Sequence, residues 1–287
     1  MTIQFHKYNI YAALFSISLT ILGVVLYVQK GGFSYNVDFT GGTEILFRFQ
    51  NKEDAAAIKQ VIQKDWNGSV YNIVEANEII VRVQQTPDKV EDLDKKIQAS
   101  INSVSQDNPA QILQTNSISS TVGESLKWNS LIAISIGLLL MLLYIALRFQ
   151  FAFAMGAIIS LAHDALAILT FFLFFDKEIS IDVIGAIMAI LGYSINDTII
   201  IFTRIRENLS KDKQTTLDKV VDQSINQTLR RTILTSFATT LVVLAQVVFG
   251  GSAIQDLSLA LLIGIVFGTY SSIFIASPVM MLFYNKK

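Results

Sequence analysis

The sequence predicts an α-helical polytopic membrane protein with six transmembrane helices and one small α+β domain between the first helix and the second. The composition is the first reason. Of the 287 residues, 52% are apolar and only 16% are charged, whereas about a quarter of the residues in a soluble domain are charged. The second reason is that the apolar residues gather into six long stretches, which leave one long polar segment between them.

Each apolar stretch is long enough to cross a bilayer, because about 20 apolar residues in a helix span a hydrocarbon core roughly 30 Å thick. The first stretch follows Lys7 and has some features of a signal peptide. Its apolar run is too long for one, and no small-x-small cleavage site follows Val28, so we predict an uncleaved anchor. The predicted spans are residues 8–28, 130–148, 152–175, 181–203, 232–250 and 257–283.

Basic residues in the connections predict the orientation. Six spans place both termini on one side, which carries eleven basic residues, including seven in the segment 204–231. The short connections on the other side carry Lys177 alone. The positive-inside rule therefore predicts cytoplasmic termini. The predicted divisions are 1–29 for the N-terminus and first span, 30–129 for an extracytoplasmic domain, and 130–287 for the other spans with the cytoplasmic loop 204–231.

The polar segment 30–129 has the pattern of a small sandwich. Alternating apolar residues predict strands, and apolar residues at helical spacing predict helices. Asn51 is the expected N-cap of the first helix, and Pro87 the expected start of the second. The resulting β-α-β-β-α-β order predicts a ferredoxin-like fold, which by itself assigns no function. The predicted elements are strand 43–49, helix 53–65, strands 70–75 and 78–84 around a turn at 76–77, a helix from 87, and strand 110–118.

The loop 204–231 contains a second helical pattern. Thr215 and Asp218 have the spacing of a capping box, and the apolar residues after them share one face. This pattern predicts an amphipathic helix at the membrane surface before the fifth span. Its simpler interpretation is a connector that must bury its apolar side.

Polar side chains inside the spans are the candidate functional residues, since an ionised group in the bilayer costs roughly 2.5–3.5 kcal/mol. His163 and Asp164 fall in the third span, and Asn196 and Asp197 in the fourth. Arg231 stands at the entrance of the fifth span, within reach of Asp197. A protonatable carboxylate, a cation and a hydroxyl-lined face are the parts of a proton path. The hydroxyl-lined face of the fifth span is predicted from Thr232, Ser236, Thr239 and Gln246.

A structural interpretation stands beside this one. Asp197 and Arg231 would form a buried ion pair that sets helix register, and His163 with Asp164 would serve packing. Small residues also predict faces where helices approach closely. These faces are Ala260, Gly264, Gly268, Ser272 and Ala276 in the sixth span, Gly156 and Ser160 in the third, and Gly185 and Ala189 in the fourth.

Several classes of function are excluded or disfavoured. The chain has no cysteine and two histidines, which excludes disulfides, thiol catalysis, thiolate metal sites and a histidine-rich metal site. The 22 basic and 23 acidic residues nearly balance, so no basic footprint indicates nucleic acid. An intramembrane aspartyl protease would use Asp164 and Asp197, but neither stands in a Tyr-Asp or Gly-x-Gly-Asp context. We expect no enzymatic activity, metal or cofactor.

Four motifs resemble those of the SecD and SecF protein-export membrane proteins. Asp38-Phe39-Thr40-Gly41-Gly42 resembles the signature that both types share. Residues 192–198 with 204–207, 229–236 and 268–278 resemble the fourth-, fifth- and sixth-span motifs of the SecF type. One departure is Asn36-Val37, where the family usually has a glycine; asparagine is the next-best residue for a left-handed backbone.

The resemblance implies half of an RND-like membrane architecture in the bacterial cytoplasmic (inner) membrane. It implies a subunit that pairs with a SecD-like subunit, and with YajC, beside the SecYEG translocon. The proton-motive force would promote translocation of secretory preproteins, with Asp197 as the protonatable carboxylate and Arg231 as its charge partner. A proton-coupled small-molecule exporter of the RND type and an uncoupled assembly scaffold are the alternatives.

Overall fold

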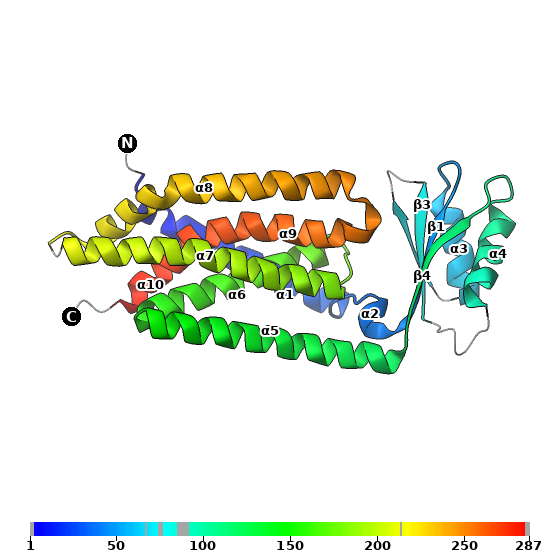
Figure 1. Ribbon diagram of the computed structural model, residues 1–287, viewed down its shortest axis with the longest axis horizontal. Helices are drawn as coiled ribbons and strands as arrows, with labels where there is room; N and C mark the ends of the chain where they lie inside the picture. The colour runs from blue at the N-terminus through cyan, green and yellow to red at the C-terminus, as the bar shows by residue number, and fades with distance from the viewer. Residues whose placement is uncertain (1–2, 67, 74–76, 85–91, 213, 285–287) are drawn as a thin grey trace.

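The computed structural model describes residues 3–66, 68–73, 77–84, 92–212 and 214–284. It is elongated, with a bundle of long helices and an α+β domain at one end of that bundle (Figure 1). Both chain ends lie at the opposite end of the bundle. The predicted helix start at Pro87 and turn residue Ala76 lie outside the described residues.

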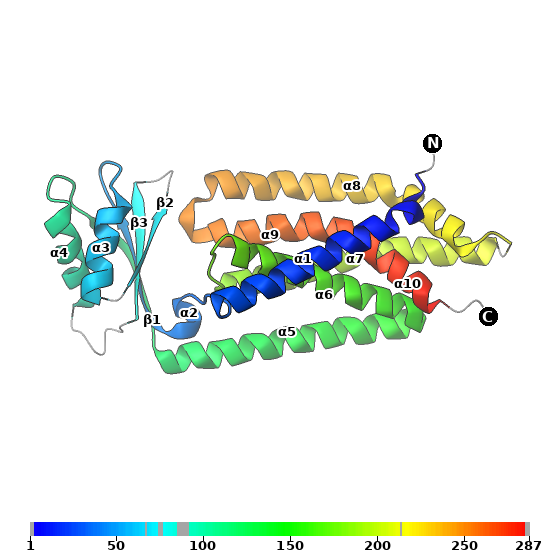
Figure 2. The same ribbon diagram turned by 180° about the vertical axis from the view of Figure 1, so that it is seen from behind.

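The six predicted spans are confirmed as six helices of the described chain that are long and apolar enough to cross a membrane. Most extend beyond the predicted bounds, because a helix continues into the polar residues at the end of its apolar stretch. Figure 2 shows α1 crossing the back of the bundle. The elements are η1 (Phe5–Tyr8), α1 (Asn9–Lys30), α5 (Ser120–Arg148), α6 (Phe151–Phe174), α7 (Ile181–Lys211), α8 (Leu217–Phe249), α9 (Gly251–Ser271), η2 (Ser272–Ala276) and α10 (Ser277–Phe283).

The segment 204–231 differs from the prediction. Helix α7 continues to Lys211, and the segment predicted as a surface helix is the first part of α8. Its apolar stripe, which includes Val221 and Ile225, is buried against the bundle. Neither glycine nor proline occurs between residues 217 and 249, so one helix runs from the polar segment into the membrane span.

Two predicted N-caps are also wrong, because the side chains have other partners. The Thr215 hydroxyl donates to Asp212 at 2.5 Å and does not cap α8. Asn51 lies in a loop, where its backbone N–H donates to the side chain of Asn108 at 3.1 Å. Asp54 instead accepts a backbone N–H in the first turn of the helix that follows. The local spacing suits each predicted cap, but a neighbouring side chain binds Thr215 and a distant one binds Asn51.

The last span contains a short π-helical segment in its second half. Residues of η2 form a π-helical segment between α9 and α10. Pro278 follows at the start of α10. Proline has no N–H to donate, and its ring clashes with the preceding turn, so the backbone widens here to continue as one crossing.

The α+β domain has the predicted ferredoxin-like order. Its sheet order is β2-β3-β1-β4, and all three strand pairs are antiparallel. The core lies between the sheet and its two helices, which cover the face turned away from the bundle (Figure 1). The other face of the sheet is turned toward the bundle. The elements are α2 (Val37–Thr40), β1 (Gly42–Arg48), α3 (Ala55–Trp66), β2 (Ser69–Ile73), β3 (Glu78–Val83), α4 (Leu93–Val104) and β4 (Gln111–Ile118).

Small residues let α9 approach α7, as predicted. A Cβ atom added at Gly264 would lie 2.6 Å from Ile190, and one at Gly268 would lie 3.1 Å from the Cβ atom of Ser194. In α7, Gly185 has open space where its Cβ would be, so no helix of the described chain packs against it and the predicted packing face stays a prediction. Its small-residue face is turned outward from the bundle.

Candidate functional site

Asp197 lies in the middle of α7 and is buried, with 3% of its surface exposed. Its carboxylate forms no hydrogen bond or ion pair with any residue that the structure describes. Arg231 on α8 is the basic residue near enough to act electrostatically on this carboxylate. The two residues are therefore neighbours, but they do not form the closed ion pair that the structural interpretation requires.

A second carboxylate is buried more deeply in the same bundle. Asp164 on α6 is 0% exposed and accepts a hydrogen bond of 2.6 Å from the Ser194 hydroxyl on α7. His163 Nδ1 lies 3.6 Å from the other oxygen of Asp164, which is too long for a hydrogen bond. Within the described chain, neither ring nitrogen of His163 has a hydrogen-bond partner. Of the predicted pair, Asp164 therefore makes the hydrogen bond to α7, and His163 does not.

Hydroxyl groups connect the remaining helices around these carboxylates. The Ser160 hydroxyl on α6 donates to Ser271 on α9 at 3.0 Å. Thr269 on α9 donates to Ser236 on α8 at 2.7 Å. Thr232 on α8 is buried, and its hydroxyl has no partner among the described residues. Polar groups therefore extend across the inside of the bundle, as a path for protons needs.

One predicted member lies elsewhere. Asn196 is exposed on the outer face of α7, because consecutive helical residues point about 100° apart and Asp197 points inward. Four members of the polar network were missed, namely Ser160, Ser194, Thr269 and Ser271. Their signal is weak in the sequence, since serine and threonine can satisfy themselves on their own helix.

The signature that begins at Asp38 joins the α+β domain to the bundle. Asp38 Oδ2 accepts a backbone N–H from Ile181, in the first turn of α7, at 3.1 Å. Asn36 orients the carboxylate by donating to it at 2.8 Å. The expectation of a left-handed backbone at Asn36 is wrong, since its φ is −77° and its side chain caps α2. Asn36 thus serves as a cap and as the support of Asp38.

The two glycines of the signature permit a close approach. Gly41 has a φ of +73° and Gly42 a φ of +137°, which favour glycine. A Cβ atom at Gly41 would lie 2.5 Å from Ser120 Cα, at the start of α5. Phe39 is buried in the outer core of the bundle, and the Thr40 hydroxyl donates to a backbone carbonyl of the same turn at 3.0 Å. The signature therefore forms a structural joint between the α+β domain and the bundle.

A charged contact supplements this joint. Arg82 on β3 is paired with Glu44 on β1 and with Glu178 in the connection between α6 and α7. Lys177 in that connection is paired with Asp256 on α9 at 2.8 Å. The bundle-facing side of the sheet is consequently held by charge to the connections at that end.

Residues 96–286 match the family model described as protein export membrane protein SecD/SecF, C-terminal. This chain belongs to the SecD/SecF protein-export family. Among SecD/SecF proteins, it is 35% identical to protein translocase subunit SecF of Calditerrivibrio nitroreducens, over 92% of this chain and 88% of the relative. It is 34% identical to protein translocase subunit SecF of Pseudomonas aeruginosa, over 97% of this chain and 90% of the relative.

Solved SecD/SecF structures have the same fold. The crystal structure of SecDF, a translocon-associated membrane protein from Thermus thermophilus, matches with a TM-score of 0.88 and 30% identity, covering 98% of this chain. A second SecDF structure, in a super-membrane-facing form, matches with a TM-score of 0.71 and 32% identity. This chain covers 38% and 39% of those longer chains.

Proposed function

We propose that this chain is the SecF-type subunit of a SecD–SecF complex that uses the proton-motive force to promote protein translocation through the SecYEG translocon. The family membership supports the translocation role. The observation that carries the coupling role is Asp197, a buried carboxylate with no hydrogen-bond or ion-pair partner among the described residues. Arg231 lies near enough to act on it electrostatically, and hydroxyl groups connect the helices around it.

Protonation of Asp197 changes which helix arrangement is favoured. The ionised carboxylate attracts Arg231 and draws α8 toward α7, whereas the neutral acid has no such attraction and packs without the cation. A proton that crosses 100 mV supplies about 2.3 kcal/mol, which changes a two-state equilibrium roughly forty-fold. That is sufficient to alternate two arrangements of packed helices.

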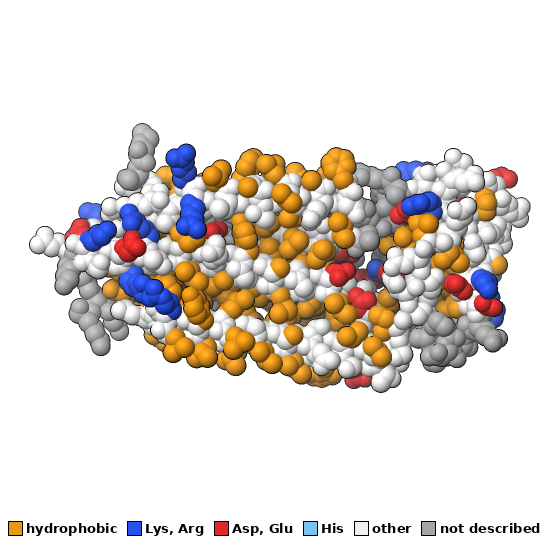
Figure 3. All heavy atoms as spheres, viewed as in Figure 1, with side chains coloured by type: hydrophobic (Ala, Val, Ile, Leu, Met, Phe, Trp, Pro, Cys, Tyr) orange, Lys and Arg blue, Asp and Glu red, His pale blue; other side chains and the backbone are white. Residues whose placement is uncertain are grey.

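The charge distribution supports the proposed orientation. Apolar side chains cover the middle of the bundle in Figure 3, and Lys and Arg gather at the end away from the sheet. Acidic side chains gather near the junction with the α+β domain. By the positive-inside rule, this distribution supports a bacterial inner-membrane protein with both termini in the cytoplasm and the domain outside it.

The exposed face of α7 supports a partner within the membrane. Gly185, Ala189, Gly192 and Asn196 lie on this face, which is turned away from the bundle. If only hydrocarbon surrounded the Asn196 side chain, its amide would lack hydrogen bonds. A second helix bundle can provide those hydrogen bonds and can approach closely over the small residues. We infer that the SecD-like subunit covers this face.

The joint at the signature could transmit movement of the helix bundle to the α+β domain. Asp38 accepts a backbone N–H in the first turn of α7, the helix that carries Asp197, and Arg82 links the sheet to the connection before α7. A movement of α7 therefore acts on the α+β domain, which would move secretory preproteins on the outer side. Contacts with SecYEG and YajC belong to the same proposal.

Proton-driven export in inverted membrane vesicles tests the coupling role. Asp197→Asn keeps the size of the side chain but cannot titrate, so we expect normal assembly and no stimulation of export by a proton gradient. Arg231→Met should have the same effect. Asp218→Asn, an exposed carboxylate at the start of α8, is the matched control and should leave export unchanged. Normal proton-driven export by Asp197→Asn would contradict the proposal.

A further inference from the structure

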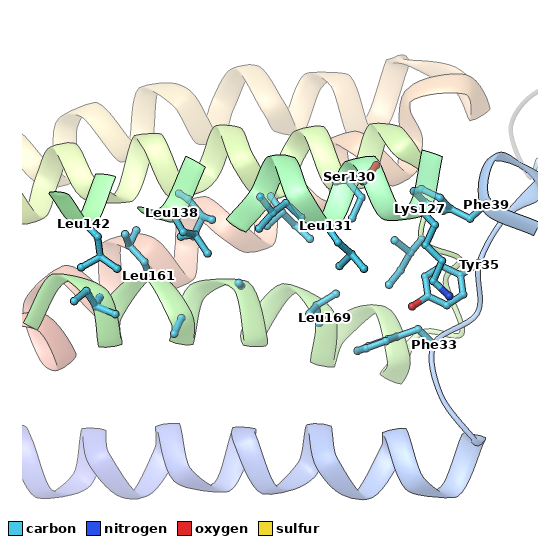
Figure 4. A pocket seen from close by; sticks show the side chains of 18 of the residues that line it. Phe33, Tyr35, Phe39, Lys127, Ser130, Leu131, Leu138, Leu142, Leu161 and Leu169 are labelled. Carbon is cyan, nitrogen blue, oxygen red and sulfur yellow. The ribbon is translucent and has the colours of Figure 1, made fainter. Parts of the chain in front are cut away.

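An apolar groove runs along α5, between this helix and α6 and α7. Its volume is about 300 Å³, at the lower end of the range for ligand sites. Leucines of α5 and α6 face one another across it in Figure 4, and the groove's outer mouth lies beside the α+β domain. The labelled leucines are Leu131, Leu138 and Leu142 on α5 and Leu161 and Leu169 on α6.

The groove exists because α5 packs loosely. Only 6% of the residues in its apolar stretch are buried, against 56% in α6. On α6, Ala162 and Ala165 line the groove with short side chains that leave space in front of α5. Water does not fill a space with apolar walls, since it finds no hydrogen-bond partners there. The occupant is therefore itself apolar along most of its length.

The mouth of the groove is polar and positively charged. Lys127 Nζ lies 4.3 Å from the centre of the Tyr35 ring, and Ser130 lies one turn further along α5. Trp128 is 60% exposed at the same level, as is typical of the membrane–water interface. Burial raises the pKa of the Tyr35 phenol, so its hydroxyl remains a hydrogen-bond donor at neutral pH.

Lys127 differs from its basic neighbours at this end of the bundle. Lys30 is paired with Asp176, and Lys177 with Asp256. Lys127 forms no ion pair with any described residue, although Glu124 lies one turn before it on α5. The mouth thus presents a positive charge that no carboxylate of the described chain neutralises.

We propose that this groove binds an anionic phospholipid, with one acyl chain between α5 and α6 and the phosphate at Lys127. The hydroxyls of Tyr35 and Ser130 would donate to the same headgroup. From Lys127 to Leu142 the helix rises roughly 22 Å, which accommodates an acyl chain that reaches about half of a 30 Å core.

Native mass spectrometry of the purified full chain, with any subunit that accompanies it, tests this site. The protein is exposed to vesicles of equal phosphatidylglycerol and phosphatidylcholine, and its bound lipids are counted. The wild type should retain more phosphatidylglycerol than phosphatidylcholine. Lys127→Gln should lower the ratio of bound phosphatidylglycerol to bound phosphatidylcholine roughly fivefold. This is the factor that corresponds to the attraction of about 1 kcal/mol between one basic residue and an anionic lipid surface. Lys177→Gln, a paired lysine outside the groove, should keep the wild-type ratio.

Filling the groove tests the acyl-chain position. Ala165→Phe should release both lipids while the unfolding temperature stays near that of the wild type. If this variant does not fold, Leu138→Trp fills the same space from α5. A wild-type lipid ratio in Lys127→Gln would overturn the proposal. So would lipid retained by a folded groove-filling variant, or a partner helix crosslinked to a cysteine placed at Leu138 in lipid-free protein.

Discussion

Removing Arg82 should loosen the α+β domain from the helix bundle. This guanidinium holds Glu44 of the sheet and Glu178 of the bundle together. In Arg82→Met, the two carboxylates would lose the guanidinium that both contact. We therefore expect the docked arrangement to lose population while the domain itself stays folded.

The partial burial of these side chains sets the size of the effect. Arg82 is 17% exposed, Glu44 21% and Glu178 14%. Breaking a fully buried pair costs about 3–5 kcal/mol, whereas an exposed pair contributes about 0–1 kcal/mol. An intermediate value of about 2 kcal/mol corresponds to a roughly thirty-fold loss of docked relative to undocked molecules.

Spin-label distances measure this equilibrium directly. The chain has no cysteine of its own, so labels at Lys95 on α4 and Phe249 on α8 report only the position of the domain. Arg82→Met should broaden the distance distribution. The control is Arg48→Met, which removes an ion pair with Glu78 inside the sheet and should leave the distribution unchanged. Equal distributions for wild type and Arg82→Met would refute the argument.

Three further outcomes are expected. Asp38→Ala removes the carboxylate that accepts the Ile181 backbone N–H at the start of α7 and should lower the free energy of unfolding by about 1 kcal/mol, measured by thermal unfolding in detergent; an unchanged value would mean that this hydrogen bond adds nothing to the cap that Ser180 provides. A hydrogen bond from Lys95 lowers the pKa of the Asp92 carboxyl, so their ion pair is complete at neutral pH and is lost as pH falls through that lowered pKa. Lys95→Gln should therefore raise the pKa of Asp92 in a carboxyl NMR titration, and no change would exclude this cause. On the proposed SecD-facing side of α7, Asn196→Leu should reduce the amount of SecD-like subunit that copurifies, whereas Met188→Leu on the same face should not.

Sequence patterns predicted the elements because the surroundings of a helix or strand determine the length and spacing of its apolar residues. A helix that crosses hydrocarbon needs a long apolar stretch. A strand with one buried face alternates apolar and polar residues, and this pattern correctly predicted Ile45 and Phe47 for the domain core. The same logic identified Asp164 and Asp197, because a carboxylate in an apolar stretch is conspicuous. The prediction failed at Asn51 and Thr215, where a distant or competing side chain decided the cap.

The sequence by itself determined the six crossings, the order of strands and helices, the family and the candidate carboxylates, since these depend on local composition and spacing. Only the tertiary structure decided that Ser194 binds Asp164, that Asp197 has no partner among the described residues, and that Asp38 accepts a hydrogen bond from the start of α7. It alone decided that α5 stands off from α6 and leaves a groove. The physical reason is that packing joins residues far apart in the chain, and their separation and orientation are properties of the assembled helices, not of any one segment.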